Sequence, residues 1–267
     1  MQQCVKEKWI KCYLAVSSLR MKNLKRIAFA ILILLLPVLA FAQSNADEIV
    51  NTQLQLHKID SQRQSLLLRL EDFKLQKIRY DLEKIGLPQL EQGDIEVKHP
   101  AYILGFVPKY KMARWVAHII IPDVLTGVVF RTNDFREDSS IATGSAVEAD
   151  YFVKELLEDS TYKYDGFGFD RGHLAPSADF RWSKKALSES YLYSNMSPQL
   201  AEFNRGSWGD LEDQIRGYMD RNPGTQLYML TGPFMGDTLS KIERGKHKLI
   251  IPKRFCKVAL DLKNKKA

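Results

Sequence analysis

A long stretch without glycine or proline constrains this chain more than any other feature. Neither residue occurs from Gln43 to Ile85, and the segment is rich in Leu, Gln, Lys, Glu and Arg, which are strong helix formers. Gly86 and Pro88 follow it, as residues that end helices do. The sequence therefore predicts one long amphipathic helix or a helical pair over residues 47–85, within a helical segment that spans residues 43–88.

Apolar residues recur along this segment at helical spacing on two stripes. One seam steps by three, four and three residues, and a shifted stripe lies upstream of it. The seam consists of Leu75, Ile78, Leu82 and Ile85, and the upstream stripe of Leu66, Leu70 and Phe73. Two interpretations are open. The helix is a coiled-coil arm that forms a homodimer through residues 47–85, or it packs against its own domain.

The residues before this helix have the composition of a targeting segment. A start at Met21 gives a positively charged beginning, an apolar run over residues 27–40 and a small-residue cleavage site that ends at Ala42. The run is shorter than the ~20 residues that a membrane span needs, and Pro37 interrupts it. We therefore expect a leader over residues 1–42, a mature protein without stable membrane insertion, and a periplasmic or secreted location. An uncleaved anchor is the alternative.

The net charge says little about partners once this leader is set aside. The whole chain carries a formal charge of +7, but the leader holds seven basic side chains and one acidic side chain. The remainder has 32 basic and 31 acidic residues, a difference of +1. The bulk charge of the mature protein therefore does not indicate nucleic acid, and only a local basic patch would do so.

From His99 onward, short patterned segments alternate with turn signals. β-Branched and apolar runs predict strands on both sides of a group of helices, which indicates an α+β fold over residues 89–267. The predicted strands cover residues 114–121, 127–131 and 226–234, with one or two more in 247–262. The predicted helices cover residues 149–159, a segment from Trp182 that ends in a turn at Ser197–Pro198, and residues 204–222.

The segment FGFDRGHLAPSADF, residues 167–180, holds the candidate chemistry. Five histidines occur in the chain, and His173 alone lies among Gly, Asp and Arg. Asp170 offers an orienting acceptor, Arg171 a fork that suits phosphate, and Gly172 a backbone that tolerates strained angles. These neighbours make His173 the candidate catalytic residue.

Polar residues further along the chain supply partners for this histidine. Glu212 and Arg216 are four residues apart on a predicted helix and share a face. Asn204 lies near the start of that helix and is rotated by ~80° from Glu212, so it can face the same cleft. Other templates do not occur: the sequence has no G-x-S-x-G elbow, no complete G-x-G-x-x-G loop and no C-x-x-C or H-E-x-x-H zinc motif.

Several separated motifs follow one another in a recognisable order. DRGH at residues 170–173 continues into LAPSAD, and SNMSPQ runs into NRGSWGDLEDQIR further along. FREDSSI lies upstream and TGP downstream, so the series covers residues 99–260. This series resembles the sugar-nonspecific DNA/RNA endonucleases, which include secreted bacterial nucleases and endonuclease G. The resemblance implies a central antiparallel sheet with helices and a ββα-metal finger that carries the histidine.

The resemblance also implies the reaction chemistry of the site. It makes His173 the general base that deprotonates the attacking water, a task that suits a neutral imidazole near pH 7. It makes Asn204 the single direct protein ligand of one Mg²⁺ ion, for which Mn²⁺ can substitute. Glu212 would orient the metal-bound waters.

The remaining candidates would bind phosphate or support the finger. The resemblance makes Arg216 and Arg171 ligands of phosphate oxygens. Arg131 is a weaker candidate, because the match of its segment to the family pattern can shift by one or two residues. Asn195 would fix the finger or its histidine, and Asp170 would brace the loop.

Such a site reads the nucleic-acid backbone and not the bases. We therefore expect an exported, magnesium-dependent endonuclease that hydrolyses DNA and RNA without sequence specificity and leaves 5′-phosphates. One alternative is a narrower phosphodiesterase or RNase on the same finger, and another is a catalytically impaired nucleic-acid-binding envelope protein. Relatives commonly continue past the point that matches residues 255–262, so we expect a domain that is truncated at its C-terminus.

Overall fold

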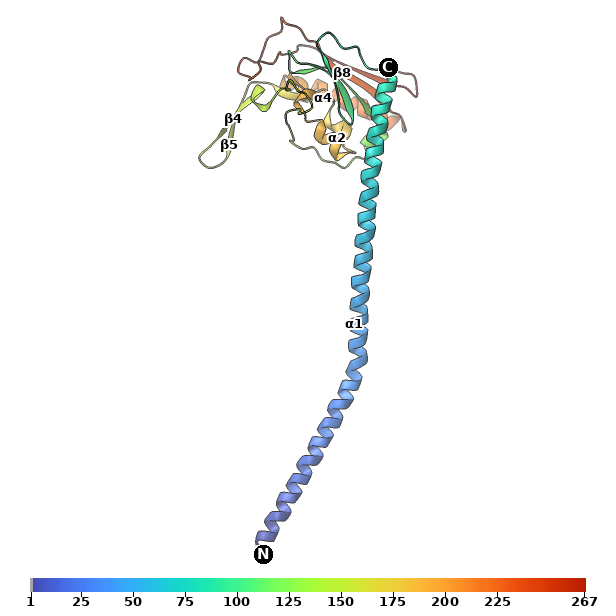
Figure 1. Cartoon of the computed structure of the whole chain (residues 1–267), viewed down its shortest axis with the longest axis vertical. Coiled ribbons are helices and arrows are strands. Elements are labelled where there is room, and N and C mark those ends of the chain that lie inside the picture. The colour runs from blue at the N-terminus through green and yellow to red at the C-terminus, as the bar shows by residue number, and fades with distance from the viewer. Residues whose placement is uncertain (1) are drawn as a thin grey trace. The chain divides into compact units, whose positions relative to one another are not determined.

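The computed structural model describes the backbone of residues 2–267 and the side chains of residues 43–267, with those of residues 20, 21, 24, 25, 29–33 and 35. The chain divides into two compact units, residues 1–68 and 69–267 (Figure 1). Most side chains of the predicted leader, including Ala42, lie outside the described part, so its cleavage stays a prediction. In the described residues, no helix has a stretch that is long and apolar enough to cross a membrane.

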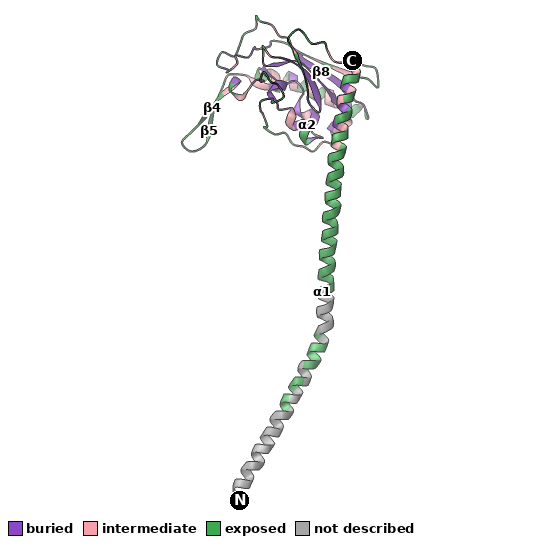
Figure 2. Cartoon of the chain, in the orientation of Figure 1, coloured by how far each residue is buried: buried purple, intermediate pink, exposed green. Residues whose placement is uncertain are grey.

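Helix α1 (Gln2–Ile85) is one continuous helix that contains the whole predicted segment 47–85, which confirms one long helix there and not a helical pair. Its last turns belong to the second unit, and there Leu75, Ile78 and Leu82 are buried (Figure 2). Lys74 adds an ion pair with Asp123. The seam over residues 75–85 therefore packs against its own domain, which confirms the second of the two interpretations for this part of the helix.

The upstream stripe of α1 has a different environment. Leu66, Leu70 and Phe73 are exposed by 61%, 49% and 58% of their surface. Phe73 is two residues from Leu75, and this offset places their side chains on nearly opposite sides of a helix. The helix therefore carries two separate apolar faces, and only one of them packs within the described chain.

Five strands form an antiparallel sheet in the order β1-β2-β3-β8-β9, which confirms the predicted central sheet. Their bounds are Ile95–Lys98 for β1, Tyr102–Val107 for β2, Met112–Ile120 for β3, Leu227–Pro233 for β8 and Phe255–Asp261 for β9. The central strands β2 and β3 are rich in apolar residues and buried along almost their whole length. This burial shows that both faces of the sheet are covered.

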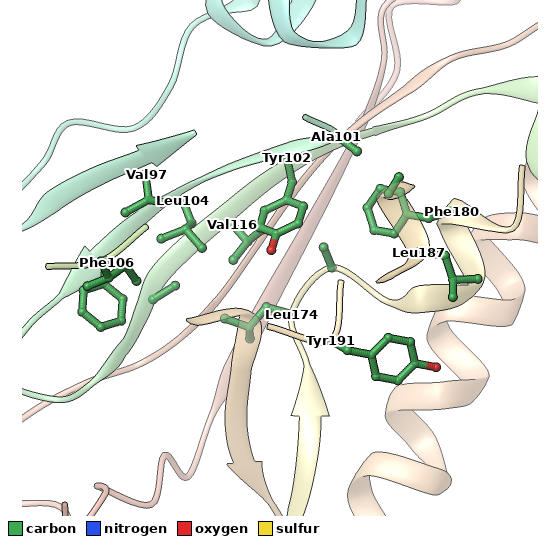
Figure 3. Close-up of a cluster of buried hydrophobic side chains, with 14 of the residues drawn as sticks. Val97, Ala101, Tyr102, Leu104, Phe106, Val116, Leu174, Phe180, Leu187 and Tyr191 are labelled. Carbon is green, nitrogen blue, oxygen red and sulfur yellow. The ribbon is translucent and has the colours of Figure 1, made fainter. Parts of the chain in front are cut away.

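Side chains on the two faces of the sheet enter different cores. On one face, Ile103 and Trp115 pack in a cluster with Ile78 and Leu82 of α1. On the other face, a larger cluster joins the sheet to segments from the middle of the chain (Figure 3). Its labelled members include Tyr102, Leu104, Val116, Leu174, Phe180 and Tyr191. Because Leu174 follows His173 directly, this cluster fixes the position of the candidate histidine.

A two-stranded ribbon followed by helices carries the DRGH motif. Strand β6 (Asp170–His173) pairs antiparallel with β7 (Met196–Gln199), and β7 leads into α3 (Ala201–Arg205) and α4 (Ser207–Arg221). This order of two strands and a helix is the one that the resemblance implies. The remaining elements are hairpin strands β4 (Phe152–Leu156) and β5 (Tyr162–Gly166), helix α2 (Lys184–Glu189), and 3₁₀ turns η1 (Pro122–Leu125), η2 (Glu148–Asp150), η3 (Ser177–Phe180) and η4 (Tyr193–Asn195).

Two predicted elements are wrong. Residues 127–131 form no strand, and Val128 and Phe130 are 77% and 80% exposed. Residues 149–159 form no helix, although they contain good helix formers. They contribute part of η2 and then β4, which pairs with β5 along its whole length. Propensity is a weak prior that such pairing overrides.

Two predicted boundaries near the site are also wrong. The expected turn at Ser197–Pro198 is part of β7, where it pairs with β6. The helix expected from residue 204 is broken, because α3 ends before Gly206 and α4 begins after it. A Cβ at Gly206 would lie 2.5 Å from the Glu202 carbonyl oxygen, so glycine permits the close approach of the two helices there.

Candidate active site

An open cleft of about 670 Å³ lies against the β6–β7 ribbon, and most of the predicted site residues line it. The ribbon contributes residues 170–173, the helices contribute residues 204–216, and residues 131–135 form a further wall. Six of the seven predicted site residues line this cleft: Arg131, Arg171, His173, Asn204, Glu212 and Arg216. Segments that are separated by tens of residues in the sequence thus meet at one surface.

His173 ends β6 and is 9% exposed. Its ring lies against Tyr191 and Phe135, with centroid distances of 5.0 and 5.7 Å. Within residues 43–267 its Nε2 has no hydrogen-bonding partner. Burial, with help from the charges of Arg131 and Arg171, lowers the pKa of His173 to about 3. The imidazole is therefore neutral at pH 7, as a general base must be.

Glycine is required at position 172 because of close packing, and not because of the strained backbone angles that the sequence suggested. It is absent from the glycines with positive φ, so its backbone needs no special conformation. A Cβ at this position would lie 2.1 Å from the side-chain oxygen of Gln199 on β7. The missing side chain at Gly172 therefore leaves the space that the Gln199 side chain occupies, next to His173.

Asn195 does not line the cleft, because it is fully buried behind the ribbon. Its side-chain oxygen accepts a hydrogen bond from the Ala175 N–H at 2.9 Å. Its amide nitrogen donates to the carbonyls of Ala175 and Ser190 at 2.9 and 2.8 Å. Asn195 thus holds the chain directly after His173 and contributes to the position of the imidazole without reaching the cleft.

Asn204 is held in one orientation by Asp170. Its amide nitrogen donates to Asp170 at 2.9 Å, and Arg205 binds both oxygens of the same carboxylate at 2.8 and 2.7 Å. Although burial opposes the shift, these hydrogen bonds hold the pKa of Asp170 below its usual value. Because a carboxylate only accepts hydrogen bonds, the amide nitrogen must face Asp170 and the amide oxygen is left for another partner.

Glu212 faces a buried lysine from the far end of the chain. The Lys257 ammonium on β9 lies 3.3 Å from the Glu212 carboxylate, and the Lys257 side chain is 1% exposed. Lys257 also donates to the Leu174 carbonyl at 3.3 Å and to Thr231 Oγ1 at 3.2 Å. Burial raises the pKa of Glu212 and lowers the pKa of Lys257, while each charge opposes the shift of the other.

Arg216 is fixed by two carboxylates and does not pair with Glu212 as neighbours on one helix face often do. It donates to Asp179 at 2.8 Å and to Asp213 at 2.6 Å. His118 lies 2.9 Å from the second oxygen of Asp179, behind the cleft. Although burial opposes the shift, the hydrogen bond from His118 helps to lower the pKa of Asp179. Asp179 therefore stays ionised and orients the guanidinium.

Arg171 is positioned by aromatic rings. Its guanidinium lies 3.6 Å from the ring centroid of Phe135 and 5.2 Å from that of Phe152. Stacking on a ring uses the flat face of a guanidinium and leaves its N–H groups at the edge for anions. Arg131 is exposed, lines the same cleft and adds a further positive charge.

A comparison with known protein families identifies the family of this chain. The sequence profile described as "DNA/RNA non-specific endonuclease" matches residues 81–267, which is more than half of the chain. This protein belongs to the DNA/RNA non-specific endonuclease family. The match covers the whole sheet, the ribbon and every residue of the cleft.

Individual relatives agree with this membership. Human mitochondrial endonuclease G is 34% identical over 190 residues, which cover 67% of this chain and 58% of the human protein. The nuclease of Serratia marcescens is 30% identical over 175 residues, which cover 65% of this chain and 61% of that protein. The chain thus spans about three fifths of the length of these curated relatives.

The fold agrees as well. A crystal structure of an EndoG/EndoGI complex, which addresses the inhibition of EndoG, superposes with a TM-score of 0.53 at 26% identity. The match covers 68% of this chain and 73% of that chain. The α+β fold, its antiparallel sheet and its ββα-metal finger are therefore those of this family of nucleases.

Three residues that support the family site were not predicted from the sequence. The LAPSAD motif could have indicated Asp179, which lies in it, but its partner Arg216 is far away in the sequence. His118 and Lys257 had no such signal, since each lies in an apolar strand. Only the sheet brings β3 and β9 beneath the cleft, where His118 contacts Asp179 and Lys257 contacts Glu212.

The donor set of the cleft fits a hard cation that keeps much of its water. Within the described residues, no group of three or more His, Cys, Asp or Glu side chains could hold a metal ion. The cleft instead offers isolated oxygen donors, among them the amide oxygen of Asn204 and the carboxylate of Glu212. Mg²⁺ is commonly held by few protein oxygens together with several waters, whereas Zn²⁺ requires a denser set of ligands.

Proposed function

We propose that this protein is an exported, metal-dependent endonuclease that hydrolyses phosphodiester bonds of DNA and RNA without sequence specificity. One observation carries the proposal. A neutral histidine, an oriented carboxamide and four arginines line a single open cleft in a member of this nuclease family. The products would carry 5′-phosphates.

The chain's own residues supply the base and the phosphate contacts. His173 accepts the proton of the attacking water, because its depressed pKa keeps the ring unprotonated at neutral pH. Arg171 and Arg216 bind the phosphate oxygens, and Arg131 adds a third contact in the same cleft. Asn195, which is buried, holds the segment after the histidine and acts as a positioning residue.

The same cleft suits one Mg²⁺ ion, with Mn²⁺ as a substitute. The amide oxygen of Asn204 would hold the ion, and the carboxylate of Glu212 would orient its waters. When bound, such an ion stabilises negative charge on the phosphate and on the departing 3′ oxygen. The hydrogen bond to Asp170, a carboxylate that Arg205 also binds, fixes the Asn204 amide, so its orientation does not depend on the ion.

Backbone recognition supports the breadth of the proposed substrate range. The cationic groups of the cleft are arginines, which match phosphate geometry, and phosphate contacts carry no direct sequence information. Single-stranded and double-stranded DNA and RNA are therefore all expected substrates. The leader over residues 1–42 supports export, to the periplasm or outside the cell.

The exposed face of α1, which ends at Phe73, supports a homodimer within residues 47–85. Its large apolar residues follow a heptad pattern with steps of seven, three, seven, four and three. They are Ile49, Leu56, Ile59, Leu66, Leu70 and Phe73, all exposed. A second copy of the same helix offers an identical exposed apolar face.

A digestion assay tests the proposed function. Supercoiled plasmid, single-stranded DNA and RNA are each incubated with the protein in Mg²⁺, in Mn²⁺ and in excess chelator. We expect cleavage of all three in either metal, none in chelator, and 5′-phosphate ends on the products. His173→Ala should lower the rate by about 10²–10⁴-fold, the usual contribution of a general base.

The exposed His57 on α1 provides the matched control, and His57→Ala should cleave at the wild-type rate. Cleavage of RNA alone would replace the proposal with the narrower RNase. Binding of nucleic acid without cleavage by folded protein would replace it with a binding protein. Full activity of His173→Ala would refute the assigned base.

A further inference from the structure

The β4–β5 hairpin stands out from the body of the domain (Figure 1). Phe152, its first residue, lines the cleft. Its pairing register runs from Phe152 opposite Gly166 to Leu156 opposite Tyr162. Since side chains alternate along a strand, this register sorts them into two faces. The proposed chemistry of the cleft makes no use of either face beyond Phe152.

One face of this hairpin is aromatic and carries a single positive charge. Phe152 and Tyr164 form an edge contact with centroids 5.4 Å apart. The Lys154 ammonium lies 4.3 Å from the ring centroid of Tyr162 and 5.9 Å from that of Tyr164. Tyr162 and Tyr164 are nevertheless 50% and 57% exposed, so a large part of each ring faces solvent.

The opposite face has a different composition and a structural partner. It carries Val153, Glu155, Lys163 and Asp165, which include both strand carboxylates of the hairpin. Arg244 pairs with Asp165 at 2.5 Å and ties this face to the domain. The acidic groups within the strands are therefore kept away from the aromatic face.

The aromatic face continues into the cleft without interruption. Phe152 lines the cleft and lies 5.2 Å from the Arg171 guanidinium, which also stacks on Phe135. A row of rings and cations thus leads from the proposed phosphate contact outward along the hairpin. At ~3.3 Å per residue, Tyr164, which pairs with Lys154, lies roughly 7 Å along the ribbon from Phe152, and Tyr162 lies further out.

We propose that this face binds the part of the substrate strand that lies beyond the scissile phosphate. Unpaired bases of that strand stack on Tyr162 and Tyr164, and the Lys154 ammonium lies near its sugar–phosphate backbone. Rows of aromatic rings interleaved with cations bind single strands in this way, because every base has a flat face. The proposal rests on the proposed nuclease function and adds a preference for unpaired strands. A duplex hides the faces of its bases, so it would gain little from the hairpin.

Binding and cleavage assays on hairpin variants test this proposal. The affinity for a fluorescent single-stranded 20-mer is measured by anisotropy in chelator, where cleavage does not interfere. Tyr162→Ala/Tyr164→Ala should weaken this affinity by about tenfold or more, as loss of base stacking does, and should change duplex affinity little. Tyr162→Phe/Tyr164→Phe keeps both rings and should bind like wild type.

Val153→Ala/Lys163→Ala is the matched control on the opposite face and should also bind like wild type. Cleavage of a dinucleotide, which has one base on each side of its single phosphodiester, should be unchanged in every variant. An unchanged single-strand affinity in the Ala/Ala variant would overturn the proposal and leave this face to a protein partner. Equal losses for single strands and duplexes would overturn stacking as the mechanism. Failure of the wild type to cleave any substrate would refute the nuclease function, whereas the anisotropy result would still decide whether the hairpin binds strands.

Discussion

Lys257 is the residue whose importance the fold reveals most directly. A buried ammonium is costly unless it has partners, and this one contacts a carboxylate, a carbonyl and a hydroxyl. Its ammonium also lies 4.8 Å from the ring centroid of Trp208. Two of these partners, Glu212 and the carbonyl of Leu174, lie beside or within the cleft. Lys257 therefore acts as a positioning residue beneath the proposed reaction centre.

Lys257→Met tests this role, because methionine keeps the apolar stem and removes the charge. We expect a folded protein whose kcat at pH 7 falls by about 10–100-fold, the usual effect of losing such a supporting partner. Without the nearby cation the pKa of Glu212 rises further above its usual value, so the acid limb of the pH–activity profile should move to higher pH.

The exposed Lys163 on β5 provides the control, and Lys163→Met should leave the turnover of a trinucleotide and its pH profile unchanged. A Lys257→Met protein with lower stability but a wild-type pH profile would show that the lysine only supports the fold.

At the scale of elements, α1 carries two different apolar faces. The face with Leu75, Ile78 and Leu82 belongs to the core of the domain. The face with Leu66, Leu70 and Phe73 is exposed, and single-copy packing gives no reason for so many large apolar residues there. The two faces can therefore be changed independently.

Substitutions on the exposed face of α1 should alter assembly and not folding. We expect wild-type protein to sediment as a dimer, and Leu66→Lys/Phe73→Lys to sediment as a monomer with an unchanged melting temperature. Leu75→Ala should instead lower the free energy of unfolding by about 2–4 kcal/mol, because it leaves a cavity in the core. A wild type that is monomeric at high concentration in equilibrium sedimentation would contradict the dimer.

At the scale of the whole molecule, buried histidines make the stability sensitive to acid. The pKa of His173 is about 3 and that of buried His118 is also lowered, both mainly by burial. An unfolded chain protonates its histidines near pH 6.5, so between pH 6.5 and about 3 it binds more protons than the folded protein. The free energy of unfolding therefore falls as the pH falls through this window.

Urea denaturation at pH 7 and pH 5 measures this effect. At 1.36 kcal/mol per unit, the shift of His173 alone should remove about 2 kcal/mol of stability between the two values. His173→Gln should lose correspondingly less over the same interval, and the exposed-site control His57→Gln should behave like wild type. Equal losses in wild type and His173→Gln would show that the imidazole is protonated in the folded protein at pH 5.

Much of the architecture could be predicted from local patterns. The stretch without glycine or proline indicated α1, and apolar runs indicated β3, β8 and β9. These elements depend on short-range periodicity, which is visible along the chain. The hairpin β4–β5 and the break at Gly206 could not be predicted in this way. The hairpin depends on pairing between strands, and the break depends on a close approach to the Glu202 carbonyl.

The sequence by itself determined the long helix, the α+β class and the family, and it predicted the candidate site residues, since motifs and periodicity are written along the chain. The tertiary structure alone decided how those residues are held. Asp170 accepts a hydrogen bond from Asn204, Asp179 accepts one from Arg216, and the Lys257 ammonium pairs with the Glu212 carboxylate. These partners are between 34 and 45 residues apart, or come from strands that meet only in the sheet. Their chemistry depends on burial and distance, which no local pattern records.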